Sequence, residues 1–326
     1  MPSQYHVAWW NVENLFDEEN SPRRTEKLAR TLGTSIVGWT PELRDRKIDQ
    51  LASVITQLND DLGPDLLGIC EVENEFVVHR LASTVNAILP ARNYQVVHAD
   101  TVDERGIDVA FLYDPAFLTA PPGELFQHVV MRRTATREIV QVNFRTHRGR
   151  TWSVFGNHWP SRSGGQLESA GYRAIAGETL AYFHQRVGEV HGPATPALAM
   201  GDFNDEPFDL SLTQYALSTR QRAKVIGGSS PRFWNLMWEI MGAGDGSFYF
   251  DNHANVLDQF LVNKNMTRPG SPIQAEPGSV ELVRFPPMVS AGTYPAPIPF
   301  GGMGKPVDTD GYSDHFPISM IVHEAD

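Results

Sequence analysis

The sequence predicts one α/β domain in which two packed, mixed β-sheets are flanked by helices. Nine short runs rich in β-branched and aromatic residues indicate strands. Three longer segments carry apolar residues at helical spacing. Two or three strand-like runs often follow one another with no helix between them, which does not match the strict strand–helix alternation of a Rossmann fold. Mixed sheets with helices on the outside fit this order better.

In chain order, strands are expected at 5–10, 66–70, 94–99, 107–113, 138–144, 151–157, 197–200, 256–262 and 317–322. Helices are expected at 43–58, 76–88 and 166–187. In the first helix Ile48, Leu51, Ile55 and Leu58 fall on one face. No internal repeat interrupts the pattern, so residues 1–326 are expected to form a single domain.

The segment 265–311 differs from the rest, because it holds nine of the 23 prolines and seven of the 27 glycines. It is predicted to be a long loop inserted into the domain, and long ordered loops are usually functional. It begins after the strand of Asp258 and leads into Asp314, which predicts a lid or specificity loop at the site. Phe285, Tyr294 and Phe300 are its candidates for contact with a base or an apolar substrate group.

Composition limits the possible classes of protein. None of the apolar runs reaches 18 residues, so no membrane span is expected. The single cysteine, Cys70, excludes an intramolecular disulfide and a thiolate zinc cluster. The net charge of −12 argues against non-specific clamping of polyanions, although a metal site supplies its own positive charge. No signal peptide is evident, so a cytoplasmic location is expected, and a chain trimmed of its leader would look the same. The protein is also expected to be a monomer.

Polar residues follow the apolar strand-like runs at six places. They are Asn11 and Glu13, Glu71, His158, Asp202 and Asn204, Asp258, and Asp314 and His315. Taken singly, most of these residues are of types that are common in turns and at the edges of sheets. Asp258 lies inside an apolar run, and a buried carboxylate needs a partner. Together the oxygens suit Mg²⁺ or Mn²⁺, and the histidines suit proton transfer or oxyanion stabilisation, which is the set of groups needed to hydrolyse a phosphate ester.

Seven motifs resemble the endonuclease/exonuclease/phosphatase superfamily, whose fold is that of deoxyribonuclease I. They are WNVEN, CEVEN, RGIDVAFLYDP, GNHWPSRSGG, MGDFND, LDQFLV and SDHFPI, in the order of the family and over nearly the whole chain. The resemblance implies a four-layer α/β sandwich with its site at one edge of the paired sheets. It is strongest with bacterial members described only as nuclease-like.

The resemblance also implies a role for each site residue. Asn11 and Glu71 would hold or support the divalent metal, with Asp314 beside it and Glu13 in its outer shell. Whether one or two metals bind stays open. Asp202 and Asn204 would orient the attacking water. His158 would stabilise phosphoryl charge, and His315, oriented by Asp258, would contact the phosphate or take a proton. The weaker candidates are Arg137 and Arg162 for substrate contact and Asp108 for orienting a second histidine.

Three functional hypotheses follow. The first is a metal-dependent phosphodiesterase acting on nucleic acid, and the second is a phosphatase or phosphodiesterase for a small phosphorylated metabolite or lipid headgroup. The third is a binding protein that has lost activity, which the complete set of expected catalytic residues disfavours. Gln259 replaces the arginine that inositol polyphosphate 5-phosphatases carry after the equivalent of Asp258, which argues against that branch. The acidic stretches 17–20 and 204–209 argue against abasic-site nucleases, and no apolar membrane hairpin of the sphingomyelinase kind is evident.

Overall fold

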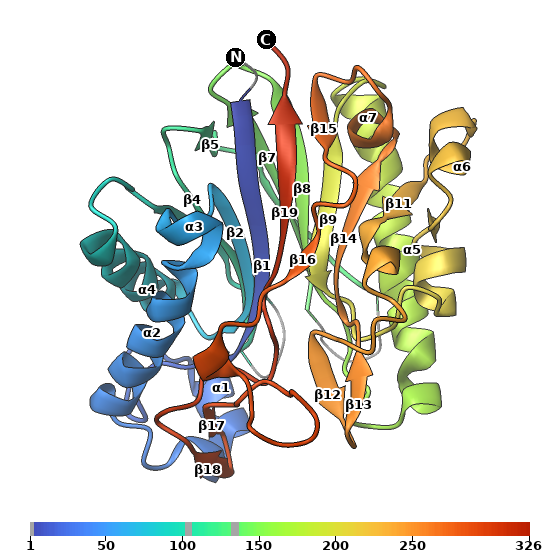
Figure 1. Cartoon of the computed structure of the whole chain (residues 1–326). Coiled ribbons are helices and arrows are strands. Elements are labelled where there is room, and N and C mark those ends of the chain that lie inside the picture. The colour runs from blue at the N-terminus through green and yellow to red at the C-terminus, as the bar shows by residue number, and fades with distance from the viewer. Residues whose placement is uncertain (1–2, 102–105, 132–136) are drawn as a thin grey trace.

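Two β-sheets face each other in the computed structural model, which describes residues 3–101, 106–131 and 137–326 (Figure 1). Within this part the first sheet has seven strands in the order β15-β19-β1-β2-β4-β3, with β16 also paired to β19. Their bounds are β1 Ser3–Leu15, β2 Leu66–Val72, β3 Gln95–Ala99, β4 Asp108–Tyr113, β15 Ile273–Ala275, β16 Glu281–Leu282 and β19 Ile318–Glu324.

The second sheet has eight strands among the described residues, in the order β10-β11-β14-β9-β8-β7-β5, with β6 also paired to β7. They are β5 Leu118–Thr119, β6 Leu125–His128, β7 Ile139–Thr146, β8 Thr151–His158, β9 Ala197–Asp202, β10 Ser218–Thr219, β11 Phe233–Asn235 and β14 Asp258–Asn263. Two small hairpins stand apart, β12 Phe248–Phe250 with β13 His253–Asn255, and β17 Gly301–Gly302 with β18 Lys305–Val307.

The helices cover the outer faces of the sheets. The α-helices are α1 Glu26–Leu32, α2 Pro41–Ile55, α3 Leu58–Asp61, α4 Glu75–Ile88, α5 Gln166–Val190, α6 Arg222–Gly227 and α7 Lys264–Thr267. Short helical turns of other kinds lie at Gly33–Ile36, Ser211–Tyr215, Leu236–Glu239 and Pro286–Met288. Thr40 and Asn74 cap α2 and α4 by accepting hydrogen bonds from Leu43 N and Val77 N, as residues at helix starts commonly do. None of the helices in the described ranges has the length and apolar composition to cross a bilayer.

Adjacent tryptophans in β1 show how the layers form. Successive side chains of a strand point to opposite faces. Trp9 therefore lies in the core between the two sheets with Met200 and Phe260, while Trp10 lies in the core beneath α2 and α4. A third core packs α5 against the outer face of the second sheet. Helices, sheet, sheet and helix make the four layers expected from the sequence (Figure 1).

All nine predicted strands and all three predicted helices are present, with ends shifted by a few residues. The strands that the sequence pattern missed are two to four residues long, too short to show a periodicity. The segment 265–311 is not the plain loop that its composition predicts. Its first part, after α7, adds β15 and β16 along β19 at the edge of the first sheet.

One aromatic residue of that segment also departs from its predicted place. Phe300 is fully buried, packs edge-on against Trp39 with ring centroids 5.8 Å apart, and cannot stack on a ligand as expected. Phe285 packs against the core beneath α2 and α4, whereas Tyr294 is 48% exposed. Proline-rich composition thus indicated the irregular backbone correctly but not the burial of its side chains.

Candidate active site

Strand ends from both sheets bring the predicted site residues together. In the first sheet Asn11 of β1 pairs with Cys70 of β2, one residue before Glu71. In the second sheet His158 of β8 pairs with Asp202 of β9, and Asp202 pairs with Asp258 of β14. Because β1 and β2 are parallel, as are β8 and β9, their carboxyl ends meet at one edge of the sandwich. His315 lies just before β19 at the same edge.

The backbone at this edge is irregular. The pairing register shifts between Asn11 and Leu15 in β1 and between Cys70 and Val72 in β2. Such bulges redirect side chains. Glu71 and Asn204 have φ values of 67° and 51°, in the left-handed region that non-glycine residues rarely adopt. Strain of this kind persists where surrounding contacts hold it, and here Asn204 N donates to Asp202 Oδ1 at 2.9 Å.

Asp202 Oδ2 is the centre of the cluster. It accepts hydrogen bonds from Asn11 Nδ2 at 3.1 Å and Asn204 Nδ2 at 3.2 Å. The Nε2 atoms of His158 and His315 lie 3.8 and 3.9 Å from it. Burial raises the pKa of Asp202 to about 7; His315 opposes the shift and Asp258 adds to it. Four of the residues singled out by sequence therefore converge on one carboxylate oxygen.

Glu71 extends this cluster into the first sheet. Its Oε1 accepts a hydrogen bond from Asn11 Nδ2 at 3.2 Å and lies 3.6 Å from His158 Nε2. Its Oε2 accepts from the backbone N–H of Asn14 at 3.0 Å. The Glu71 side chain is 18% exposed, whereas that of Asp202 is 2% exposed. Glu71 is thus the carboxylate of the pair that solvent reaches.

His315 is held by Asp258 across the sandwich. Its Nδ1 lies 2.6 Å from Asp258 Oδ2, and Asp258 Oδ1 accepts a hydrogen bond from Trp9 Nε1 at 3.0 Å. Burial by itself lowers the pKa of His315. The charges of Asp258, Asp202 and Asp314 outweigh burial, so that the pKa stays well above its usual value. The structure thus places beside Asp258 the partner that a buried carboxylate requires.

Two lysines that sequence reasoning missed lie near Glu13 and Asp314. Lys305 Nζ is 3.7 Å from Asp314 Oδ2 and 4.0 Å from Glu13 Oε1. Lys47 is fully buried; burial lowers its pKa to about 8, against the opposing charges of Glu13 and Asp314. A signal for Lys47 existed, because it precedes Ile48 and is four residues before Leu51 on the apolar face of its helix.

The two arginines predicted to bind substrate contact the backbone next to the site. Arg137 is 4% exposed and donates through Nη1 to the carbonyl oxygen of Trp159 at 2.8 Å. Arg162 donates through Nε to the carbonyl oxygen of Asn204 at 2.7 Å and pairs with Asp209 at 2.9 Å. Both arginines therefore support the backbone that follows β8 and β9, and the charge of Arg162 is already countered.

Asp108 contacts a histidine, but not one of the two predicted for catalysis. Its Oδ2 lies 3.1 Å from His98 Nε2, and its Oδ1 accepts from Thr101 N and Oγ1 at 3.0 and 2.7 Å. His98, Asp100 and Asp108 each place one potential metal ligand within 4.8 Å of the others. Asp100 is 87% exposed, and the Thr101 hydrogen bonds already occupy Asp108 Oδ1. The three side chains are compatible with a bound cation, but the hydrogen bonds of Asp108 already explain why they lie close together.

The main cluster fits a divalent cation by its chemistry. Glu71, Asp202 and Asp314 are carboxylates, and Asn11 has an amide oxygen. Oxygen donors of this kind suit Mg²⁺ and Mn²⁺. The Asn11 Nδ2 that bridges Glu71 and Asp202 holds two acidic groups close together in a buried place. A cation there would relieve their repulsion.

Comparison with known proteins agrees with this geometry. The model of the Endonuclease/Exonuclease/phosphatase family matches residues 6–324. The chain belongs to the endonuclease/exonuclease/phosphatase family. Members of this family are phosphoric ester hydrolases that generally depend on a divalent metal. The chain has no match among curated proteins.

Solved structures of this family share the fold at low sequence identity. Danio rerio TDP2 complexed with a single-strand DNA product is 15% identical with a TM-score of 0.58, covering 98% of this chain and 99% of that one. The human Nocturnin catalytic domain with bound sulfate is 14% identical with a TM-score of 0.56, covering 99% and 98%. The Bacteroides thetaiotaomicron mannosyl-6-phosphatase Bt3783 is 16% identical with a TM-score of 0.53, covering 98% and 99%.

Proposed function

We propose that the protein is a divalent-metal-dependent phosphodiesterase that cleaves nucleic acid in the manner of an endonuclease. The observation that carries the proposal is the convergence of Asn11, His158 and His315 on the carboxylate of Asp202. Phosphoryl transfer depends mainly on positioning and on neutralising charge, and this cluster offers groups for both. A bound cation would supply Lewis-acid polarisation of a phosphoryl oxygen.

The chain's own residues would divide the work as follows. Asn11, Glu71 and Asp314 would hold the cation, which Mg²⁺ or Mn²⁺ fits. Asp202 and Asn204 would orient the attacking water. The Asn204 side chain is fixed for this role, because its Nδ2 also donates to the carbonyl oxygen of Trp159.

The two histidines would stabilise the charge that develops on the phosphate during hydrolysis. His158 Nε2, close to both Glu71 and Asp202, would face the phosphoryl oxygens. His315 would donate a proton or stabilise charge at Nε2 while Asp258 holds its Nδ1.

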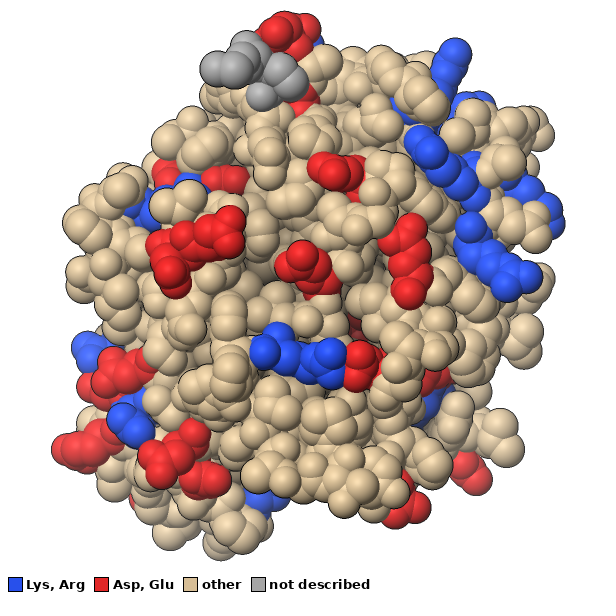
Figure 2. Space-filling model, in the orientation of Figure 1, with Lys and Arg blue, Asp and Glu red and all other residues tan. Residues whose placement is uncertain are grey.

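The charge of the protein supports a second candidate, a phosphatase or phosphodiesterase for a small phosphorylated metabolite or lipid headgroup. The formal net charge is −12, and acidic side chains are spread across the middle of the face in Figure 2. Such a surface opposes the approach of a polyanion. Gln259, in place of an arginine, is fully buried and bonds the carbonyl oxygen of Asp205 and the amide of Asn235, so it offers no charge to a substrate.

One panel of substrates separates the two candidates. We expect Mg²⁺-dependent cleavage of single-stranded DNA, plasmid or RNA, and of bis-p-nitrophenyl phosphate, with p-nitrophenyl phosphate hydrolysed far more slowly. Nuclease activity should fall steeply as salt rises, because phosphate contacts release counterions. Preference for p-nitrophenyl phosphate with little salt dependence would establish the small-ester enzyme instead. Undiminished turnover after exhaustive chelation would contradict both.

A further inference from the structure

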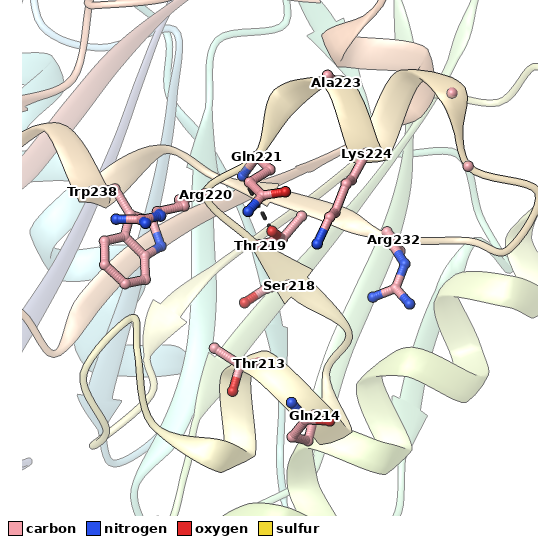
Figure 3. Close-up of a pocket in the computed structure, with 12 residues that line it drawn as sticks. Thr213, Gln214, Ser218, Thr219, Arg220, Gln221, Ala223, Lys224, Arg232 and Trp238 are labelled. Atoms are coloured by element: carbon pink, nitrogen blue, oxygen red, sulfur yellow. Dashed lines mark hydrogen bonds between the residues drawn. The ribbon is translucent and has the colours of Figure 1, made fainter.

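A hollow of about 770 Å³ lies at the outer edge of the second sheet, away from the candidate active site. Its walls come from Ser211–Tyr215, β10, α6 and the chain on either side of β11 (Figure 3). β14 runs from Asp258 at the catalytic end to Asn263, and Asn263 pairs with Phe233 beside the hollow. The five steps from Asp258 to Asn263 correspond to about 17 Å of strand. The hollow is therefore separate from the catalytic cluster.

Cations surround this hollow without acidic neighbours in the sequence. Residues 210–238 contain four Arg or Lys residues and no Asp or Glu, in a chain of net charge −12. Arg220, Lys224 and Arg232 line the hollow, and Lys224 and Arg232 point into it side by side in Figure 3. An adjoining hollow of about 580 Å³ shares Arg232 and adds Lys264 and Arg268, together with one carboxylate, Glu189, which is paired with Arg186. Figure 2 shows basic side chains gathered over this edge, at the upper right.

These cations differ from most arginines elsewhere in the protein in having no acidic partner. Within the described ranges, the side chains of Arg220, Lys224 and Arg232 make no ion pair and donate no hydrogen bond. Arg162 and Arg92, by contrast, each bind two carboxylates. Unpaired positive charges held close together repel one another and are relieved by a bound anion.

Two buried polar atoms of the hollow give independent evidence of a ligand. Ser218 is 2% exposed, and its Oγ makes no hydrogen bond to any described residue. Trp238 Nε1 is also buried and without a partner in the described part of the chain. Buried polar groups usually have a hydrogen-bond partner. The hydroxyl, the indole N–H and the three cations all donate, which matches a ligand rich in acceptor oxygens such as a phosphate.

We propose that this hollow binds the phosphate backbone of single-stranded nucleic acid, as a second binding site remote from the catalytic cluster. The charges continue from Arg220 through Arg232 to Arg268 across two adjoining hollows, which suits a chain of phosphates better than one small anion. The guanidinium of Arg220 lies 5.4 Å from the ring centroid of Trp238, an arrangement on which a base can stack. None of the described residues lining the two hollows is an exposed large aliphatic side chain, which disfavours a membrane.

This proposal rests on the proposed function, because it takes single-stranded nucleic acid as the ligand. Its test measures binding alone and needs no turnover. The probe is fluorescein-labelled oligo-dT of 20 nucleotides, bound to the full chain with chelator present so that none is cleaved. The test variant is Arg220→Gln/Lys224→Gln/Arg232→Gln. The control variant, Arg30→Gln/Arg80→Gln/Arg145→Gln, also removes three positive charges, so both change the formal charge from −12 to −15.

The test variant should bind the oligonucleotide at least tenfold more weakly at low salt, and its slope of log affinity against log salt should be shallower by about 2, as for three lost phosphate contacts. The control should change affinity less than threefold. Hydrolysis of bis-p-nitrophenyl phosphate should be equal in all three proteins, so that a failed binding test is distinct from a failed proposed function. Equal affinity of the two variants would overturn the proposal, as would binding of phosphatidylserine vesicles but not of the oligonucleotide.

The single substitution Lys224→Glu provides a second test in case the triple variant does not fold, because the Lys224 side chain is exposed and makes no hydrogen bond or ion pair to any described residue. Its melting temperature should equal that of the unmodified protein, and its affinity for the oligonucleotide should fall at least threefold. Unchanged affinity in this variant would overturn the proposal.

Discussion

Nδ1 of His315 lies 2.6 Å from Oδ2 of Asp258, although 57 residues separate them in the chain. This contact joins the start of β14 in one sheet to the loop before β19 in the other. Trp9 Nε1 donates to the second oxygen of Asp258, so the carboxylate has a partner on both sides. The orientation of the histidine therefore depends on the packing of the two sheets, and on this contact the first prediction rests.

The variants Asp258→Ala and His315→Ala should each lower kcat about 100-fold or more, the range found for acid–base and electrostatic groups. The double variant should be little worse than either single variant, because the two side chains act as a unit. Steady-state kinetics on bis-p-nitrophenyl phosphate measures kcat for the two single variants and the double variant. Losses that multiply in the double variant would show that the pair does not act together.

Asp202 should be needed for activity and should destabilise the metal-free fold when it is charged. Asp202→Asn should lower kcat about 100-fold or more, while the metal-free protein should become more stable at pH 8. The pKa of Asp202 is raised to about 7 in the folded state, so its contribution to stability is present below pH 4 and lost as pH rises through 7. Thermal melting at pH 5 and pH 8 with chelator checks this. A variant less stable than the unmodified protein at pH 8 would contradict it.

Mg²⁺ should stabilise the unmodified protein and have little effect on Asp202→Asn or on Glu71→Gln. A ligand that binds only the folded state raises its stability by about 2.7 kcal/mol at a hundredfold excess over Kd. Melting curves over a Mg²⁺ titration measure this shift without any turnover. Equal shifts in all three proteins would mean that the cation binds elsewhere, for example beside His98 and Asp108.

Lys47 should compensate the buried charge of Glu13. Burial raises the pKa of Glu13, and Lys47 opposes that shift. Glu13 Oε2 also accepts the backbone N–H of Phe300 at 2.8 Å, so it anchors the segment before β17. Lys47→Met should cost about 3 kcal/mol of unfolding free energy, as removal of one partner from a buried charge pair does. Urea denaturation measures the loss, and Lys47→Met/Glu13→Gln should lose less than the sum of the single variants.

His184 should make the fold sensitive to mild acid. It lies on the buried face of α5, stacks on Phe233 with ring centroids 4.0 Å apart, and has a pKa that burial lowers to about 4. The unfolded chain takes up a proton near pH 6.5 and the folded chain does not, so stability falls as pH drops from 6.5 to 4. His184→Phe should remove up to about 3 kcal/mol of that pH dependence. His79→Gln, at an exposed histidine, is the control.

The sequence by itself determined the main strands and helices and the edge of the sheets at which the candidate catalytic residues lie. Periodicity is a local property, so the strands of Asn11, Glu71, His158, Asp202 and Asp258 could be read from the chain. A polar residue at the end of an apolar run marks the end of a strand, and the order of the motifs indicated the family. These inferences need only neighbours in sequence and a resemblance, and they agree with the fold.

Only the tertiary structure decided what each charged side chain faces. Arg137 and Arg162 donate to backbone carbonyls of residues beside the site, and Phe300 is buried with its ring edge-on to Trp39. Lys47 belongs with Glu13, and Arg220 and Arg268, 48 positions apart, border adjoining hollows. Burial and charge pairing depend on which surfaces pack together. Packing brings together residues that are far apart in the chain, and no periodic pattern in the sequence marks such pairs.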